Sequence, residues 1–250
     1  MRWSISTWGK YFGAPMHIAC VAWHTDEGSA LSYKQCMCFS ATASFSAGTV
    51  LLVIGAACLV RSQGPKEWPY ALIPAFFGVQ QLLEGGLWLS LGPQQSCWTA
   101  PLTEGYSVFS QVFWPIYIPL AVCLLEPVGM RRRFIGLIAA GGAAVGCYLA
   151  WYMAHIPVVA EVRGAHVAYV FPHFHQPLAT VLYVLAACLA PLLSGWAQVR
   201  WFGVLASVSL AATAYFYAQW FISTWCFFAA CLSALIWFFF AQRTRGASTA

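Results

Sequence analysis

From Ser40 onward, long apolar runs alternate with short polar connections. Seven runs have about 20 residues each, the length that a helix needs to cross the hydrocarbon core of a bilayer. They lie at approximately 41–60, 70–90, 105–125, 134–154, 177–195, 199–218 and 221–241. Each run must be helical, because a lipid-exposed segment has to pair its own backbone groups and no run alternates as a barrel strand does. The pattern predicts an all-α integral membrane bundle of seven transmembrane helices; six spans with a re-entrant segment are the alternative.

The basic residues indicate how this bundle is oriented. If the spans alternate in direction, nearly all basic residues that follow residue 36 fall on one side of the membrane. They are Arg61, Lys66, Arg131, Arg132, Arg133, Arg200, Arg243 and Arg245. Loops rich in Lys and Arg stay in the cytoplasm. The pattern therefore predicts an N-terminus outside, a cytoplasmic C-terminus and a multi-pass location in the cell membrane.

Composition agrees with a membrane protein and excludes one other class. The chain is 61% hydrophobic and 8% charged, whereas soluble domains carry about 25% charged residues. Aromatic residues make up 17%, with 13 Trp, which suits anchoring at both membrane interfaces. The net charge is +5, but no basic stripe is interleaved with aromatic residues, so we expect no nucleic-acid partner. The expected partner is the lipid bilayer.

The first 36 residues differ from the rest of the chain. They contain Asp26 and Glu27 and no apolar run long enough to span a membrane. We divide the chain into an N-terminal tail (1–36), a seven-helix membrane domain (37–242) and a cytoplasmic tail (243–250). Two interpretations of residues 1–36 remain open: a soluble tail, or a segment upstream of a usual start at Met37.

The second run contains the main candidate site. Its apolar sequence is interrupted by Gln80, Gln81 and Glu84. An ionisable residue inside a span is costly and is by default a functional-site hypothesis. The outer halves of the other runs also carry polar residues, including Gln111, whereas the inner halves are nearly all apolar. We predict an outward-open polar cavity that holds a small ligand, with Glu84 near its floor. The alternative is that the glutamines only join helices by hydrogen bonds.

Two histidines and several cysteines suggest metal chemistry at the same end. His173 and His175, in the stretch VFPHFHQP, share one face if that stretch is extended. Two imidazoles, a carboxylate and a thiolate suit a divalent metal, zinc or copper. The candidate ligands are Glu84, His173, His175, Cys38 and Cys226. Two alternatives remain: histidines that only hydrogen-bond at the interface, and a disulfide among Cys38, Cys97 and Cys226.

Glycines and prolines predict how the helices pack. Gly142 and Gly146 have the G-x-x-x-G spacing that lets helices approach closely. We expect this contact inside the bundle rather than in a dimer. Prolines within or near the spans predict kinks that hold where neighbouring groups pair the freed carbonyls. They are Pro74, Pro115, Pro119 and Pro191.

Three motifs carry a resemblance to a known family. The chain reads MCFSATASFSAG from Met37, has Gln80, Gln81, Glu84 and Gly85 in its second span, and has Trp225–Cys226–Phe227 in its last. It resembles an uncharacterised family of bacterial polytopic membrane proteins over about residues 37–240. The resemblance implies the same membrane architecture, a bacterial inner membrane and Met37 as the usual start. It implies no activity, because the function of that family is unknown.

Other seven-helix families fit less well. Retinal proteins need a lysine in the last span, and the only lysines here are Lys10, Lys34 and Lys66. Membrane hydrolases of the ceramidase and progestin-receptor group have paired histidines on a late helix, and the last two runs contain none.

Three hypotheses for function follow. The first is a membrane protein that binds a divalent metal or small ligand around Glu84 from the outer side. The second is a metal-dependent membrane hydrolase of a lipid-like substrate, with Glu84 as catalytic general base. The third is a structural or accessory subunit without a site.

Overall fold

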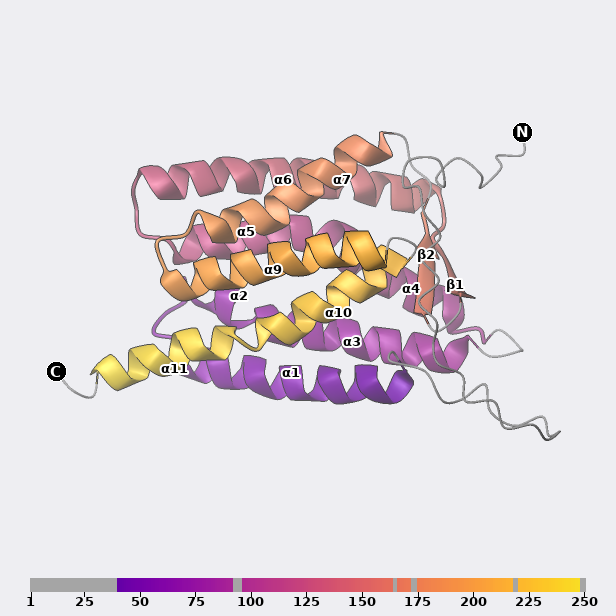
Figure 1. The fold of residues 1–250 in the computed structure, drawn as a ribbon, viewed down its shortest axis with the longest axis horizontal. Coiled ribbons are helices and arrows are strands. Elements are labelled where there is room, and N and C mark those ends of the chain that lie inside the picture. The colour runs from indigo at the N-terminus through magenta and orange to yellow at the C-terminus, as the bar shows by residue number, and fades with distance from the viewer. Residues whose placement is uncertain (1–39, 92–95, 164–165, 172–174, 218–219, 248–250) are drawn as a thin grey trace. The chain divides into compact units, whose positions relative to one another are not determined.

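The computed structural model describes residues 40–91, 96–163, 166–171, 175–217 and 220–247. Helices dominate this part of the chain, and Figure 1 shows them running alongside one another. The first elements are α1 (Ala41–Arg61), α2 (Trp68–Ala71), α3 (Ile73–Ser90), α4 (Thr99–Ser107), the π-helix η2 (Val108–Phe113), α5 (Trp114–Leu125) and α6 (Met130–His155). The later helices are α7 (Gln176–Val184), the π-helix η3 (Leu185–Leu189), α8 (Ala190–Leu192), α9 (Ala197–Phe216), α10 (Phe221–Ser233) and α11 (Ile236–Ala247).

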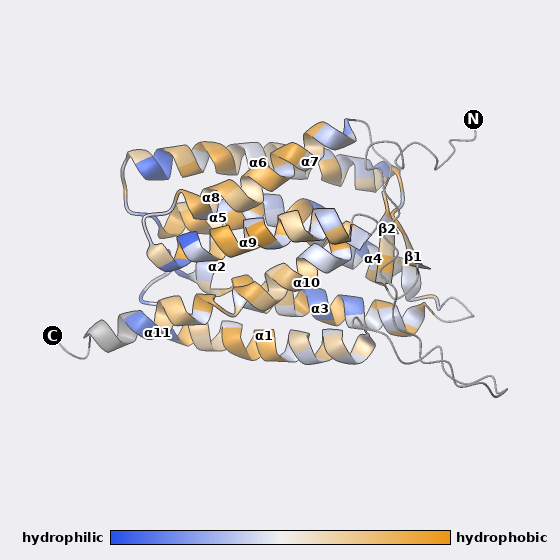
Figure 2. Ribbon diagram, in the orientation of Figure 1, coloured by the Kyte–Doolittle hydropathy of each residue, from blue (hydrophilic) through white to orange (hydrophobic). Residues whose placement is uncertain are grey.

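The helices join into rods that match the apolar runs. If segments that continue into one another are counted together, the described residues form seven rods. Five rods are long and apolar enough to cross a membrane: Ala41–Arg61, Thr99–Leu125, Met130–His155, Ala197–Phe216 and Phe221–Gln242. Pro177–Leu192 is apolar but shorter, and α3 carries the three polar residues of the candidate site. Figure 2 shows the apolar residues concentrated along the middle of the rods. The prediction of a mainly helical fold is thereby confirmed, with five rods that could span a membrane.

A β-hairpin departs from the all-α prediction. Strands β1 (Val159–Arg163) and β2 (His166–Val170) pair antiparallel, with Ala160 opposite Tyr169. Each strand has five residues, and both are rich in Val, a residue that favours strands. Ala160 and Val167 are buried against Leu87 near the end of α3. The hairpin therefore covers one end of the bundle, beside α3, α4 and α10.

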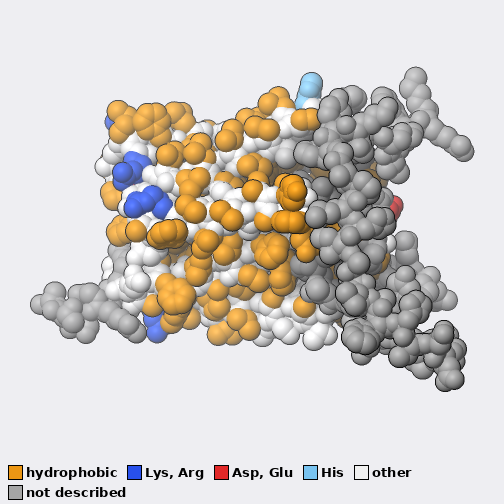
Figure 3. All heavy atoms as spheres, in the orientation of Figure 1, with side chains coloured by type: hydrophobic (Ala, Val, Ile, Leu, Met, Phe, Trp, Pro, Cys, Tyr) orange, Lys and Arg blue, Asp and Glu red, His pale blue; other side chains and the backbone are white. Residues whose placement is uncertain are grey.

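Apart from Arg163, which ends β1, the Lys and Arg residues of the described chain lie at the opposite end of the bundle. Figure 3 shows Lys and Arg side chains at that end and hydrophobic side chains along the middle of the face in view. Arg61 ends α1 and lies over the Trp237 ring, 4.2 Å from its centroid. Arg131–Arg133 begin α6, and Arg200 lies in the first turns of α9. This placement agrees with the grouping predicted from the sequence.

Glycines let two pairs of helices approach closely. A Cβ atom on Gly48 of α1 would lie 2.9 Å from the carbonyl oxygen of Gly78 on α3. One on Gly142 of α6 would lie 1.9 Å from the carbonyl oxygen of Pro115 on α5. Gly146 is similarly crowded by Ile116. The G-x-x-x-G spacing therefore serves contacts inside the bundle, as predicted, and small residues are what such contacts need in a bilayer.

Pro115 accounts for the change from α-helical to π-helical hydrogen bonding at η2, in the rod Thr99–Leu125. Pro115 has no N–H group, so in the i→i+5 pattern of a π-helix the Ser110 carbonyl lacks its backbone donor. The Tyr183 hydroxyl of α7 donates to that carbonyl at 2.8 Å. This contact confirms, for Pro115, that a neighbouring helix pairs the freed group.

Candidate functional site

Glu84 lies on α3 near the end of the bundle that the hairpin covers. Its side chain is 1% exposed. The Ser223 hydroxyl of α10 donates to Oε1 at 2.5 Å, and Gln81 Nε2 donates to Oε2 at 3.4 Å. Ser223 is the third residue of α10, in its first turn, and it begins a run of four buried residues, S-T-W-C. A buried carboxylate is thus held by neutral donors from two helices.

Gln80 connects this carboxylate to the aromatic core. It is fully buried, and its Oε1 accepts a hydrogen bond of 2.6 Å from the Trp114 indole N–H. The Trp114 ring stacks on Phe77, with ring centroids 3.8 Å apart. Phe77, Gln80, Gln81 and Glu84 follow one another at the spacing that places residues on one helical face. One face of α3 therefore changes from aromatic to polar over two turns.

Two tyrosines and a thiol complete the surroundings of Glu84. Tyr106 of α4 and Tyr169 of β2 stack with ring centroids 4.5 Å apart. Both hydroxyls and the Cys226 thiol lie within electrostatic range of the Glu84 carboxyl. Burial, and then the neighbouring Glu84, raises the pKa of the Tyr169 hydroxyl well above its ordinary value, so this group stays neutral. We call Gln80, Gln81, Glu84, Tyr106, Tyr169, Ser223 and Cys226 the Glu84 cluster.

The Glu84 cluster contains polar atoms that lack conventional hydrogen-bond partners. They are Gln80 Nε2, Gln81 Oε1, Tyr106 Oη and Tyr169 Oη, all buried. The Cys226 thiol, a weak hydrogen-bonding group, forms hydrogen bonds with Gln80 and Tyr106. Gln81 Oε1 and Tyr169 Oη have no partner among the described residues. Native proteins leave only a few such groups per 100 residues, and each one calls for an explanation. Unpaired donors and acceptors around one carboxylate are the feature expected where a small polar molecule or ion binds.

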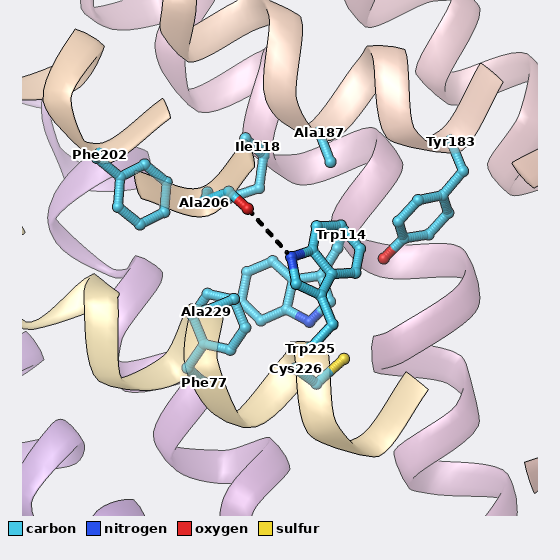
Figure 4. A pocket seen from close by; sticks show the side chains of 10 residues that line it. All are labelled: Phe77, Trp114, Ile118, Tyr183, Ala187, Phe202, Ala206, Trp225, Cys226 and Ala229. Carbon is cyan, nitrogen blue, oxygen red and sulfur yellow. Dashed lines mark hydrogen bonds between the residues drawn. The ribbon is translucent and has the colours of Figure 1, made fainter. Parts of the chain in front are cut away.

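A small apolar cavity adjoins the cluster (Figure 4). It has about 30 Å³ of room for the centre of a water-sized sphere. Since one water needs about 10–15 Å³ by this measure, it holds roughly two water-sized groups. Its lining residues are Phe77, Trp114, Ile118, Tyr183, Ala187, Phe202, Ala206, Trp225, Cys226 and Ala229. Trp114 and Cys226 border both the cavity and the Glu84 cluster.

The predicted metal ligands are only partly placed. His173 and Cys38 lie outside the described residues. His175 is exposed at the start of α7, in a left-handed conformation with φ 53°, whereas Glu84 is buried with its hydrogen bonds made to Gln81 and Ser223. Within the described part of the chain, no group of three His, Cys, Asp or Glu could hold a metal ion. The metal site stays a prediction.

Other candidate residues have separate positions. Gln111 lies in η2, half-buried, and takes no part in the hydrogen bonds of Glu84, Gln80 and Gln81. Cys226 is buried and Cys97 exposed, and both thiols are free, so these two do not form a disulfide with each other. The Glu84 side chain is 1% exposed in the described structure, with Tyr106 and Tyr169 near it. The outward-open cavity stays a prediction.

Sequence reasoning missed three residues of this region: Tyr106, Trp114 and Tyr169. An indole N–H inside an apolar run needs a hydrogen-bond acceptor. The third run has few polar groups of its own, so Trp114 could have been identified from the sequence as a donor to a glutamine of another run, as it is to Gln80. No signal placed Tyr169 here, because it comes from a connection between spans.

Comparisons with known proteins agree with the resemblance seen in the sequence. The profile of a family of unknown function, DUF6629, matches residues 37–250. No curated protein and no solved structure matches the chain.

Proposed function

Because this chain belongs to DUF6629, a family of unknown function, we propose its function from its own geometry. It is a multi-pass membrane protein that binds a small ligand in the Glu84 cluster, reached from the outer side of the membrane. The observation that carries this proposal is a set of buried donors and acceptors around Glu84 that have either a weak thiol partner or no partner among the described residues. A purely structural network gains nothing from leaving donors and acceptors unpaired in a medium without water, since each costs free energy. A ligand with complementary groups would pair them.

The same proposal includes a membrane topology. All seven rods cross the membrane, the N-terminus is outside, and the C-terminus is cytoplasmic. The clustering of Arg61, Arg131–Arg133 and Arg200 at the end opposite the hairpin supports this orientation. The resemblance favours a bacterial inner membrane. Alkaline phosphatase fused after Ala250 should be inactive, and the same enzyme inserted between Gly164 and Ala165 should be active. The reverse pattern would contradict the orientation.

Native mass spectrometry tests the binding. The full-length protein, purified in a mild detergent, should retain an added mass that is absent from Glu84→Gln. The matched control is Glu104→Gln, because Glu104 is an exposed carboxylate on α4, and this variant should retain the mass. If wild type and Glu84→Gln give the same spectrum with no bound species in either, the cluster is not a ligand site.

The metal version of this function depends on residues beyond the described part. Zinc or copper would need His173 or Cys38 to approach Glu84 or Cys226, with His175 turning inward. Metal analysis of the purified protein tests it: about one zinc or copper per chain is expected, with loss in Glu84→Ala and in His173→Ala. Absence of metal from wild type would end the metal proposal and, with it, the hydrolase alternative in which Glu84 acts as general base on metal-bound water.

A structural subunit without a site is the remaining alternative. It predicts a stable partner protein that co-purifies with the chain and no added mass that depends on Glu84. The unpaired atoms of the Glu84 cluster favour the binding proposal over this one.

A further inference from the structure

The Glu84 cluster and the apolar cavity form one continuous site. Trp114 places its ring against the cavity and its N–H on Gln80 Oε1 at 2.6 Å. Cys226 lines the cavity and lies beside Gln80 and Tyr106. No helix separates the two parts, because each of these side chains belongs to both.

Along this site, both α3 and α10 have polar residues at the end near the hairpin and apolar, cavity-lining residues toward the middle of the bundle. On α3, Phe77 lines the cavity, and Gln80, Gln81 and Glu84 follow toward the end covered by the hairpin. On α10, which contacts α3, the order along the chain is reversed: Ser223 holds Glu84, and Trp225, Cys226 and Ala229 line the cavity. The site is therefore polar at its outer end and aromatic toward the middle of the bundle.

The polar end has a carboxylate without a cation. The ion pair Arg131–Glu126 joins described residues, and within the described part of the chain no Lys, Arg or His forms an ion pair with Glu84. A buried carboxyl either is neutral or is held ionised by a cation, and a bound cation would hold Glu84 in its ionised form. Gln81 Oε1 is a second acceptor on the same side and has no donor of its own.

These observations lead to a ligand class. Resting on the proposed binding function, we propose that the site takes a small amphiphilic amine, with its ammonium head at Glu84 and Gln81 and a compact apolar body in the cavity. The ammonium supplies the missing positive charge and donors. The indole and phenyl rings of Trp114, Trp225 and Phe77 surround the body, and aromatic faces also attract the charged head. The cavity holds roughly two water-sized groups, so short bodies fit and long chains do not.

Thermal unfolding of the full-length protein in detergent tests this class with defined probes. n-Butylammonium should raise the unfolding temperature with a half-maximal concentration at least tenfold below that of methylammonium, butan-1-ol or butyrate. n-Octylammonium should bind more weakly than n-butylammonium, because its body exceeds the cavity. Short probes also leave the micelle nearly unchanged.

Matched variants separate the two ends of the site. Glu84→Gln should abolish the preference for n-butylammonium over butan-1-ol. Ala229→Phe fills the cavity and should abolish the preference for n-butylammonium over methylammonium. Its control is Ala140→Phe, since Ala140 is exposed on α6, and this variant should behave as wild type.

A second measurement covers the case in which Ala229→Phe does not fold. Cys226 borders the cavity, so n-butylammonium should slow its alkylation by N-ethylmaleimide, detected by peptide mass spectrometry, and leave the exposed Cys97 unaffected. Equal protection of both thiols, or none of either, would overturn the proposal.

The outcomes distinguish this inference from the function on which it rests. If methylammonium matches n-butylammonium, the cavity takes no part and only the binding function survives. If butan-1-ol matches n-butylammonium in wild type, the head is not cationic and the proposed class is wrong. If no probe acts and native mass spectrometry finds no bound species, both proposals fail.

Discussion

Two buried carboxylates, Glu84 and Glu126, have very different surroundings. Glu126 is 4% exposed at the end of α5. It accepts hydrogen bonds from Ser194 Oγ at 3.0 Å and from the Gly195 backbone N–H at 2.9 and 3.1 Å, and it pairs with Arg131 at 3.4 Å. Arg200 in turn donates to the carbonyls of Ser194 and Gly195. Glu126 thus fixes the connection between α8 and α9.

Glu84 is equally buried but has no cation in the described part of the chain. Among the described residues, Gln81 Oε1 and Tyr169 Oη beside it lack a hydrogen-bond partner, and Gln80 Nε2 and Tyr106 Oη have only the Cys226 thiol. Burial of an acidic side chain is therefore not enough to identify it as functional; its hydrogen-bond and charge partners must also be considered. A completely paired acid stabilises the fold, whereas an incompletely paired one is available for a ligand.

The largest expected effect belongs to Glu126→Ala. This change leaves the Gly195 N–H and the Ser194 hydroxyl without their acceptor, and we expect a loss of about 3 kcal/mol in the free energy of unfolding. Thermal unfolding in detergent measures it, with the exposed Glu104→Ala as a control that should match wild type. An unchanged unfolding temperature would remove the contrast between the two acids.

Ser223→Ala should have a smaller effect. It removes the donor 2.5 Å from Glu84 Oε1, and hydrogen bonds to charged groups contribute about 1.5–3 kcal/mol. We expect a loss near the lower value, and a smaller one when the same change is made in Glu84→Gln. Equal losses in both backgrounds would mean that the Ser223 hydroxyl does not stabilise the carboxylate.

Two tyrosines provide a matched pair. The Tyr183 hydroxyl donates to the Ser110 carbonyl, so Tyr183→Phe should cost about 1 kcal/mol. The Tyr169 hydroxyl has no hydrogen-bond partner among the described residues, so Tyr169→Phe should change the free energy of unfolding by less than about 0.5 kcal/mol in ligand-free protein. A large loss in Tyr169→Phe would show that the Glu84 cluster is paired after all.

Glu84→Gln should have the smallest effect on stability. A glutamine has nearly the same shape, can still accept from Ser223 and removes an uncompensated charge, so the unfolding temperature of ligand-free protein should be unchanged or higher. Glu126→Gln, its counterpart, should lower that temperature, since it weakens the contact with Arg131. A drop in Glu84→Gln as large as that in Glu126→Gln would make Glu84 a structural acid.

Much of the fold could be predicted from the sequence. The apolar runs coincide with the helical rods because a segment of that length and hydropathy can satisfy its backbone in a bilayer only as a helix. The position of Gln80, Gln81 and Glu84 on one face of α3 also follows from local spacing. The hairpin was missed, because its strands are five residues each and too short to stand out between spans.

The partners of the site residues could not be predicted in the same way. Ser223 lies 139 residues from Glu84, and Trp114 lies 34 residues from Gln80. Which faces meet depends on how far each helix is rotated and how closely it approaches its neighbours. Glycines such as Gly48 and Gly142 set the approach, and the π-helical segments η2 and η3 reset the rotation partway along two rods.

The sequence by itself determined the helices, the grouping of basic residues at one end and the presence of a costly carboxylate in the second rod, because these depend on local length, spacing and charge. Only the tertiary structure decided that Glu84 is buried beside Ser223 and two stacked tyrosines, that His175 is exposed, and that an aromatic cavity adjoins the Glu84 cluster. Those features depend on contacts between segments distant in the chain, which local preference does not specify.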